Sequence, residues 1–443
     1  MNICVIGLGF VGLSMAAVIA SKGFRVFGVE NDKEKASQIS QGKIPFFEPK
    51  VKEFFLSNFG KNLEITTTFS EAASKSDIIF ICVGTPSNSD GSSDLTFIKK
   101  VSHEIGEILK NSNSFKIIVV KSTVPPTTTN NLVKTTIEKV STKKSGIDFG
   151  LCMNPEFLKE GTAVDDMLSP HLVVIGTEDE QTRKTMHDFY EKMYSNKLPP
   201  ILDTNVTNAE LIKYVNNAFL ATKISFINTI ANICNHIEGA DVEVIAKAIG
   251  HDPRIGSLFL KAGPGFGGSC FPKDVSGFLN FSSSLGYKPI LLESTQKVNQ
   301  EQPREIFRMI ENKVKNFEDK TICILGLSFK KNTDDVRESV SIKIVKSLLE
   351  KTPKIKVHDP MAIENFKKIF GEKIEYSKNS IDCITDSDCC IILTDWDEFA
   401  KLTEDDFKNN MKNPCVIDAR RLLDPKKMHS IDFSAIGFGK NLR

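Results

Sequence analysis

The chain has 443 residues, which is more than one hydrophobic core usually serves, so we expect two or three domains. Its 57 Lys and Arg residues nearly balance its 56 Asp and Glu residues, and this argues against a basic nucleic-acid-binding surface. No segment has the uninterrupted apolar length of a membrane span, so the sequence predicts a soluble, cytoplasmic protein with neither a nucleic-acid nor a membrane partner.

Short apolar runs alternate with helical stretches in the first part of the chain. The predicted strands are NICVIG, FRVFGVE, LEITTT, DIIFICVG, KIIVVKSTV, FGLCMNP and HLVVIG. The predicted helices lie near residues 10–21, 32–41, 95–109 and 128–140, with one more after residue 179. Apolar strands that alternate with helices predict a parallel sheet covered on both faces. We therefore expect a Rossmann-like α/β domain over residues 1–200.

The middle of the chain changes character. From 208 to about 250, apolar residues recur at helical spacing without a strand signal, and further helices are predicted to about 314. The region 201–314 is thus predicted to be helical, with a long central helix that bridges two domains and serves as a dimer surface. Strand signals resume at TICILG, KIKVHD, CCIILT and CVIDAR, so 315–443 is predicted to be a second, smaller Rossmann-like domain with a doubly wound parallel sheet.

A glycine-rich motif follows the first predicted strand and opens a helix. In a dinucleotide-binding turn, the glycines allow the tight turn, the approach of the pyrophosphate and close packing of helix on strand. Glu30 ends the second strand, where a carboxylate binds ribose hydroxyls and favours NAD over NADP. The alternative is a glycine turn without a cofactor. Thr85 and Thr123 follow later strands at the same edge of the sheet. The residues of the motif are Gly7, Gly9, Phe10, Val11 and Gly12.

The cysteines give no sign of a disulfide framework or a metal site. Most of the ten lie in short β-branched runs, where cysteine behaves as a small buried hydrophobe, and no spacing suits zinc. Cys270, in GFGGSCFPKD, is the exception because it lies in a glycine-rich loop. A thiolate there can add to an aldehyde and form a thioester after oxidation, which permits a four-electron oxidation of an alcohol to an acid. The alternative is one more structural thiol.

Eight motifs in order carry a resemblance to a known family. They are GLGFVGL, IPFFEP, VGTP, KSTVPP, NPEFLKEG, AELIKYVNNAFLATKISFIN, DPRIGSLFLKAGPGFGGSCFPKD and GLSFKKNTDDVRES. Over essentially its whole length the chain resembles the nucleotide-sugar 6-dehydrogenases, that is, the UDP-glucose/GDP-mannose dehydrogenase family. The resemblance implies NAD-dependent oxidation of C6 of UDP-glucose to UDP-glucuronate, a precursor of polysaccharides and other glycans.

The resemblance also implies a catalytic set. Cys270 would be the nucleophile that forms the thiohemiacetal and the thioester. Lys213 would lie near the sugar C6 oxygen, and Asn217, one helical turn on, would hydrogen-bond the developing oxyanion. From the residues alone, this pair could instead be a solvated helix face.

Three further residues complete that set. Asp274 would handle the proton or an ordered water, Glu156 would be the base of thioester hydrolysis, and Thr123 would hold the water. Which of Lys213, Asp274 and Glu156 acts as base at each step stays open. Structural alternatives are a helix-start acid for Glu156 and a helix cap for Asp274.

Ligand contacts follow from the same resemblance. Arg254 would reach the substrate of a neighbouring subunit, which implies a homodimer or a higher oligomer. The implied cofactor contacts include the residues of the glycine-rich motif together with Glu30, Thr85 and Thr123. The resemblance adds Lys35, Lys273 and Arg337 to them. The implied substrate contacts are Glu156, Phe157, Leu158, Glu160, Lys213, Asn217, Arg254, Phe259, Gly267, Phe329, Lys330 and Arg420.

Several functions remain possible from the sequence. GDP-mannose is the second candidate substrate, followed by a UDP-N-acetylhexosamine. A catalytically idle nucleotide-sugar-binding homologue would have no reason to keep Cys270, and a two-electron 3-hydroxyacid dehydrogenase would not need a second α/β domain. One departure from the family is VPPTTTNN, which lacks the glycine-containing turn usual after KSTVP.

Overall fold

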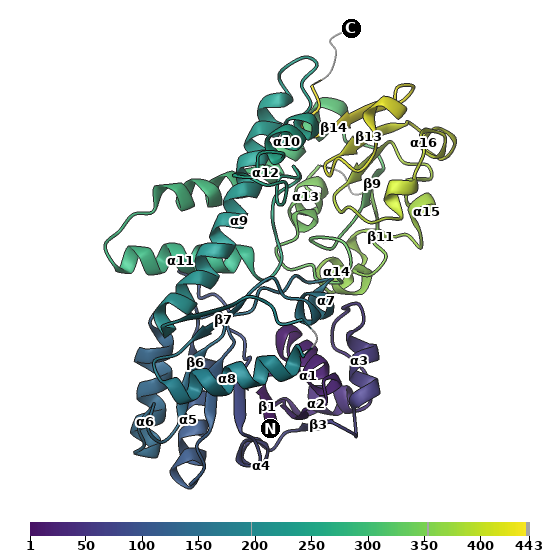
Figure 1. The fold of residues 1–443 in the computed structure, drawn as a ribbon. Coiled ribbons are helices and arrows are strands. Elements are labelled where there is room, and N and C mark those ends of the chain that lie inside the picture. Colours follow the sequence, from purple (N-terminus) through teal and green to yellow (C-terminus); the bar gives the residue numbers. More distant parts are fainter. Residues whose placement is uncertain (196, 352–353, 440–443) are drawn as a thin grey trace. The chain divides into compact units, whose positions relative to one another are not determined.

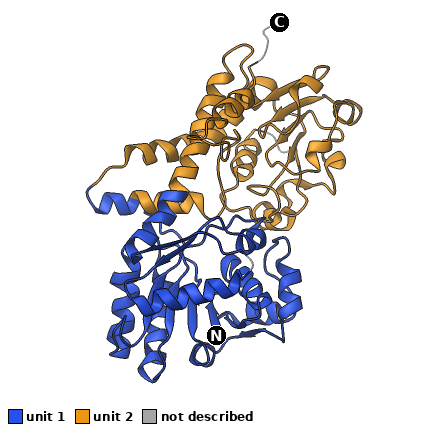
Figure 2. Cartoon of the chain, viewed as in Figure 1, with its two compact units in different colours: residues 1–216, 280–286 blue, residues 217–279, 287–443 orange. Residues whose placement is uncertain are grey.

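The computed structural model describes residues 1–195, 197–351 and 354–439. The chain forms two compact units (Figures 1 and 2): unit 1 comprises 1–216 and 280–286, and unit 2 comprises 217–279 and 287–443. Two of the boundaries fall within helices, α9 (Val206–Cys234) and α11 (Phe271–Ser284), and the third, at 286/287, follows α11. The three-domain division of the chain stays a prediction, and residues 196, 352–353 and 440–443 of those domains lie outside the described residues.

Unit 1 contains an eight-stranded sheet with the order β3-β2-β1-β4-β5-β6-β7-β8 (Figure 1). Its neighbouring strands run parallel, as predicted, except where Met153 of β6 pairs with Gly176 of β7 in antiparallel orientation. The alternating pattern of strands and helices does not reveal that reversal, because it gives no strand direction. The strands are β1 (Asn2–Ile6), β2 (Arg25–Val29), β3 (Leu63–Thr66), β4 (Ile78–Ile81), β5 (Ile117–Val120), β6 (Gly150–Met153), β7 (Val173–Gly176) and β8 (Ile201–Thr204).

Helices cover both faces of this sheet. Ile3 and Val5 of β1 point into one apolar core, whereas Cys4 and Ile6 point into the other, as the pleat requires. One face is covered by α1 (Phe10–Ser21), α3 (Val51–Asn58), α7 (Ala163–Leu168) and α8 (Glu180–Met193). The other face is covered by α4 (Phe69–Ser74), α5 (Thr96–Lys110) and α6 (Thr135–Ser141). The predicted doubly wound architecture is confirmed.

Unit 2 contains a six-stranded parallel sheet with the order β11-β10-β9-β12-β13-β14. Ile322 and Ile324 of β9 belong to a core shared with α9, α10, α12, α13 and α14, and Cys323 and Leu325 face a second core with α15 and α16. The strands are β9 (Ile322–Leu325), β10 (Ile355–His358), β11 (Glu375–Tyr376), β12 (Cys389–Ile392), β13 (Cys415–Asp418) and β14 (Asp432–Ala435). The helices are α10 (Val242–Gly250), α12 (Ile290–Lys313), α13 (Val340–Leu349), α14 (Ile363–Phe370), α15 (Ser380–Ile384) and α16 (Glu404–Asn410).

Capping side chains explain where several helices begin. Asp32 accepts the first free N–H groups of α2 (Lys33–Ser40), and Asp179 and Ser339 do the same for α8 and α13. The predicted helix near 128–140 begins with a π-helical stretch, Thr129–Lys134, before α6. The elements that were not predicted include α3, α4, α7, β8, β11 and β14.

Candidate active site

The glycine-rich turn between β1 and α1 has the geometry that a dinucleotide needs. Gly7 has a φ of 89°, in the left-handed region that favours glycine. A Cβ on Gly12 would lie 1.9 Å from the Gly7 carbonyl oxygen, so α1 can approach the turn only because no side chain is there. No atom of the described chain lies within 4 Å of a Cβ built on Gly9, which leaves room for a pyrophosphate. The helix begins at Phe10 and its first N–H groups face the turn.

The predicted ribose-binding residues meet at the carboxyl end of β2. Glu30 is buried, and its carboxylate lies 2.6 Å from the ammonium of Lys35 on α2. Thr85 follows β4 and Thr123 follows β5, and the Thr85 hydroxyl donates a hydrogen bond to the Thr123 carbonyl at 2.8 Å. The order of the sheet changes direction between β1 and β4, the point where α/β sheets bind nucleotides. These residues therefore fit NAD.

A buried ion pair lies in the same unit. The Lys213 ammonium is 2.9 Å from the Glu156 carboxylate, and both side chains are less than 10% exposed. Lys213 is therefore not part of a solvated helix face. Glu156 lies in the loop after β6, where no helix begins, so the helix-start alternative is also wrong.

The charge state of Glu156 depends on its neighbours. Burial alone would raise the pKa of this carboxyl, but the Lys213 ammonium, the backbone N–H of Leu158 and the Lys121 ammonium together hold the pKa below its usual range. The Leu158 N–H donates to Glu156 Oε2 at 2.6 Å. Glu156 is thus an ionised, hydrogen-bonded carboxylate, able to accept a proton.

The rest of the NPEFLKEG motif forms the loop around this pair. The Phe157 ring centroid lies 5.7 Å from the Lys213 ammonium, and Glu160 is buried. Glu48, in the IPFFEP motif, accepts the N–H groups of Gly161 and Ala163 at 2.6 and 2.8 Å. Glu48 holds the end of the loop in place and was not predicted to have a role, although an acid within a proline-bounded motif was a signal.

In unit 2, Cys270 immediately precedes α11. The N–H of Asp274 donates to the Cys270 carbonyl at 2.8 Å, which is the first hydrogen bond of that helix. Among the ten cysteines Cys270 is the exposed one, whereas eight are buried and Cys82 is half-buried. The helix N-terminus carries partial positive charge, and this favours a thiolate.

Asp274 is buried in the first turn of α11, so it does not cap this helix. It accepts a hydrogen bond from the Asn217 amide at 2.7 Å and lies 2.6 Å from the Lys273 ammonium. Asn217 is also buried. The six predicted catalytic residues thus form two groups: Thr123, Glu156 and Lys213 in unit 1, and Asn217, Cys270 and Asp274 in unit 2.

The glycines before Cys270 pack against another part of unit 2. A Cβ on Gly267 would lie 2.3 Å from the Glu338 carbonyl oxygen, and one on Gly268 would lie 2.7 Å from the Phe329 ring. The Gly268 N–H donates to the Arg337 carbonyl at 3.0 Å. The two glycines therefore join the cysteine loop to the GLSFKKNTDDVRES segment.

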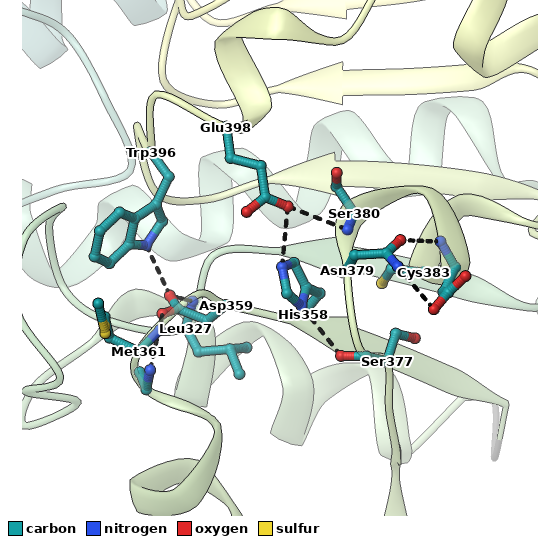
Figure 3. A network of polar contacts seen from close by, with 12 residues as sticks. Leu327, His358, Asp359, Met361, Ser377, Asn379, Ser380, Cys383, Trp396 and Glu398 are labelled. Carbon is teal, nitrogen blue, oxygen red and sulfur yellow. Dashed lines mark hydrogen bonds and ion pairs between the residues drawn. The ribbon is translucent and has the colours of Figure 1, made fainter.

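A polar network shapes the carboxyl edge of the second sheet (Figure 3). Asp359 accepts the indole N–H of Trp396 at 3.0 Å and the N–H groups of Leu327 and Met361 at 2.7 and 2.9 Å. His358 contacts the Ser377 carbonyl and the Glu398 carboxylate, each at 3.1 Å. The network fixes the loops after β9 and β12, and the loop after β9 carries two predicted substrate contacts, Phe329 and Lys330.

Basic side chains gather at this edge. Arg420 donates to the carbonyls of Phe329 and Leu393 at 2.8 and 2.6 Å, and the Lys330 ammonium lies over the Phe329 ring. Asp395 is 3.2 Å from the Lys261 ammonium; burial would raise its pKa, but Arg420 and Lys261 lower it. Lys261 was not predicted, although it stands in the same KAGPGFGGSC run as Cys270.

Two predicted arginines are exposed and held by neighbouring aspartates. The Nε and Nη2 groups of Arg254 both donate to the Asp252 carboxylate, and the side chain is 87% exposed. Arg337 pairs likewise with Asp335. Phe259 packs its ring 6.2 Å from that of Phe271, next to Cys270.

In the VPPTTTNN turn, which lacks the family's usual glycine, Thr127 adopts the left-handed conformation that glycine normally takes. Thr127 has a φ of 74°, a left-handed conformation that β-branched residues rarely adopt. Glu210 of α9 accepts the N–H groups of Thr127 and Thr129 at 2.6 and 2.7 Å and fixes the turn after KSTVPP. The role of Glu210 was also missed, because a glutamate in a helix gives no sign of distant partners.

Within the described residues, no group of three or more His, Cys, Asp and Glu side chains could hold a metal ion. No helix in that part of the chain is long and apolar enough to cross a membrane.

Comparison with known proteins identifies the family. Three models of the UDP-glucose/GDP-mannose dehydrogenase family match the chain: its NAD binding domain at residues 1–194, its central domain at 207–301 and its UDP binding domain at 323–425. The UDP-glucose 6-dehydrogenase AglM of Haloferax volcanii is 37% identical over 98% of this chain and 100% of its own length. The UDP-glucose 6-dehydrogenase TuaD of Bacillus subtilis is 38% identical over 99% and 93%.

A solved structure agrees over the full length. The UDP-glucose dehydrogenase from Pyrobaculum islandicum superposes with a TM-score of 0.90 at 33% identity, covering 99% of this chain and 98% of that one. The resemblance found in the motifs is confirmed. The chain belongs to the UDP-glucose/GDP-mannose dehydrogenase family, whose members are NAD-dependent oxidoreductases.

Proposed function

We propose that this protein oxidises C6 of UDP-glucose to the carboxylate of UDP-glucuronate, in two successive two-electron steps with NAD. The observation that carries the proposal is the exposed Cys270 thiol at the start of α11, in a chain 37–38% identical over nearly its full length to UDP-glucose 6-dehydrogenases. A dehydrogenase that stopped at the aldehyde would not need such a thiol.

Cys270 acts on the aldehyde. Its sulfur adds to C6 and the proton goes to O6, which gives a thiohemiacetal. Loss of a hydride from C6 and of the proton from O6 then gives a thioester. Water attacks C6, the C–S bond breaks, and the leaving thiolate is stabilised by the N-terminus of α11. NAD, when bound, accepts the hydride of each oxidation.

The buried polar groups serve the oxygen and proton transfers. The amide of Asn217 and the ammonium of Lys213 stabilise negative charge on O6. Glu156, already ionised, takes the proton of the water that hydrolyses the thioester, with Thr123 holding that water. Asp274, fixed by Asn217 and Lys273, accepts a proton in the first oxidation.

Basic residues are proposed to bind the diphosphate. Lys330 and Arg420 were predicted as substrate contacts, and Lys261 belongs with them because it shares Asp395 with Arg420. Bound phosphate oxygens would accept hydrogen bonds from such cations. The Phe329 ring offers an apolar surface next to them.

We also propose a homodimer in the cytoplasm, where thiols stay reduced. Phe219, Phe226 and Ile233 lie on α9 seven residues apart, and each is at least half exposed. This spacing places them along one face of the helix, as in a coiled-coil seam. The exposed Arg254 is available to a second subunit.

A substrate comparison tests the proposal. Purified protein is supplied with NAD and, in parallel, with UDP-glucose, GDP-mannose or UDP-N-acetylglucosamine, and the products are identified by mass spectrometry. UDP-glucuronate should form at a kcat/KM well above that of the other two reactions. Faster oxidation of GDP-mannose would assign the protein to the other branch, and no oxidation of any sugar would indicate an idle homologue.

A further inference from the structure

Lys121, in the KSTVPP motif, has no role in the proposed chemistry, yet its side chain reaches the loop that carries Glu156. Its ammonium donates to the Asn154 side-chain oxygen at 2.8 Å and to the Pro155 carbonyl at 3.2 Å. Lys121 follows β5, and Asn154 follows the neighbouring strand β6. The lysine therefore binds the two residues that directly precede Glu156.

Asn154 is itself fixed from two other elements. Its side-chain oxygen also accepts a hydrogen bond from the Tyr190 hydroxyl of α8 at 2.5 Å, and its amide group donates to the Val174 carbonyl of β7 at 2.7 Å. Asn154 is 1% exposed, so water does not compete for these bonds. The start of the loop is thus held rigidly, and Lys121 is the charged member of the network.

The electrostatic partner of Lys121 is Glu156. Burial lowers the pKa of Lys121 to about 8, and Glu156 is the largest influence that raises it. Cys82 and Cys152 also face this ammonium, but burial raises the pKa of each thiol to about 12, so both are uncharged near neutral pH. Lys213 is the other cation of the group and repels Lys121.

We propose that Lys121 is a positioning residue, which holds the loop segment 154–156 and so sets the Glu156 carboxylate against Lys213. Its charge adds to that of Lys213 in keeping Glu156 ionised. This inference rests on the proposed function, because it concerns the step that Glu156 serves.

The test compares variants in the pH dependence of the full reaction. Lys121→Gln removes the charge but keeps an N–H donor for Asn154, and Lys121→Met removes both. Because the Lys121 charge lowers the pKa of Glu156, each variant should raise that pKa and move the acid limb of kcat toward neutral pH, by up to about one unit. Lys121→Arg keeps the charge and should leave the limb at its wild-type position. At pH values below the acid limb, hydrolysis slows and the thioester on Cys270 should accumulate. Mass spectrometry of the intact protein would detect it.

Lys116 provides a matched control. It precedes β5 at the opposite end, is buried, and donates to the carbonyls of Ser74 and Ser76 at 2.8 and 2.6 Å. Lys116→Met should lower the melting temperature without moving the acid limb. Melting curves of all variants identify any that fail to fold, and Lys121→Gln is the variant expected to be tolerated.

The outcomes separate the two proposals. If the wild type forms no UDP-glucuronate, the proposed function is wrong, and so is the proposed role of Lys121. If the wild type forms it and Lys121→Gln is folded with its acid limb at the wild-type position, Lys121 is a purely structural lysine and only this inference is wrong.

Discussion

The surroundings of Cys270 distinguish it chemically from the other nine cysteines. Burial raises the pKa of Cys4, Cys82 and Cys152, which keeps these thiols protonated and unreactive. Cys270 is exposed and stands at the N-terminus of a helix of 14 residues, whose dipole favours the thiolate. Exposure and position, rather than residue type, determine which cysteine can act as a nucleophile.

Alkylation should therefore be selective. Brief treatment of the folded protein with iodoacetamide is expected to modify Cys270 before any other cysteine and to abolish oxidation of UDP-glucose in proportion. Peptide mapping by mass spectrometry measures the site. Cys270→Ser should resist this modification and turn over at least about a thousandfold more slowly than the wild type. Inactivation that follows modification of Cys82 instead would contradict the assignment.

The turn after β5 shows how one element can depart from its family without loss of fold. Thr127 takes a left-handed conformation that costs a non-glycine residue about 1–2 kcal/mol. Two hydrogen bonds to the buried Glu210 offset this strain by fixing the backbone on either side. The turn that presents Thr123 is held in this way.

Thr127→Gly should therefore stabilise the protein. Relief of the strain exceeds the extra entropy that glycine, at about 0.5–1 kcal/mol, adds to the unfolded chain, so a gain of up to about 1 kcal/mol is expected. The measurement is the urea midpoint of unfolding. Thr128, whose φ is −60°, is the control: Thr128→Gly should lower the midpoint, because no strain is relieved. A lower midpoint for Thr127→Gly would mean that the threonine side chain contributes more than its backbone costs.

Much of this architecture was predictable, because it depends on local patterns. Continuous apolar runs marked β1, β4 and β5 as buried strands, and the glycine spacing marked the nucleotide turn. The short exposed strand β8 was missed because its sequence, ILDT, has no apolar run. Glu48, Glu210 and Lys261 were missed for another reason: their partners are distant in sequence, and only the fold brings them together.

At the scale of the whole molecule, α9 exposes a row of large apolar side chains that a partner could cover. Large apolar side chains at least half exposed on one helix face normally mark an interface. Phe219, Phe226 and Ile233 form such a face. A second copy of the chain can cover it by pairing α9 with its own symmetry mate, which is how twofold interfaces are built.

Phe226→Glu should dissociate the proposed dimer. A carboxylate in the centre of an apolar seam loses its hydration without gaining a partner. Light scattering is expected to give twice the chain mass of 49.2 kDa for the wild type and the single-chain mass for the variant. Leu56→Glu, at an exposed position on α3, serves as the control and should remain dimeric. A dimeric Phe226→Glu protein would place the interface elsewhere.

The four-electron oxidation is tested most directly by its stoichiometry. A limiting, known amount of UDP-glucose is converted to completion with excess NAD, and NADH is measured by its absorbance while the sugar product is quantified by chromatography. We predict two NADH for each UDP-glucose consumed, with UDP-glucuronate as the product. One NADH for each sugar, with an aldehyde as the product, would contradict the role of Cys270 and with it the proposed reaction.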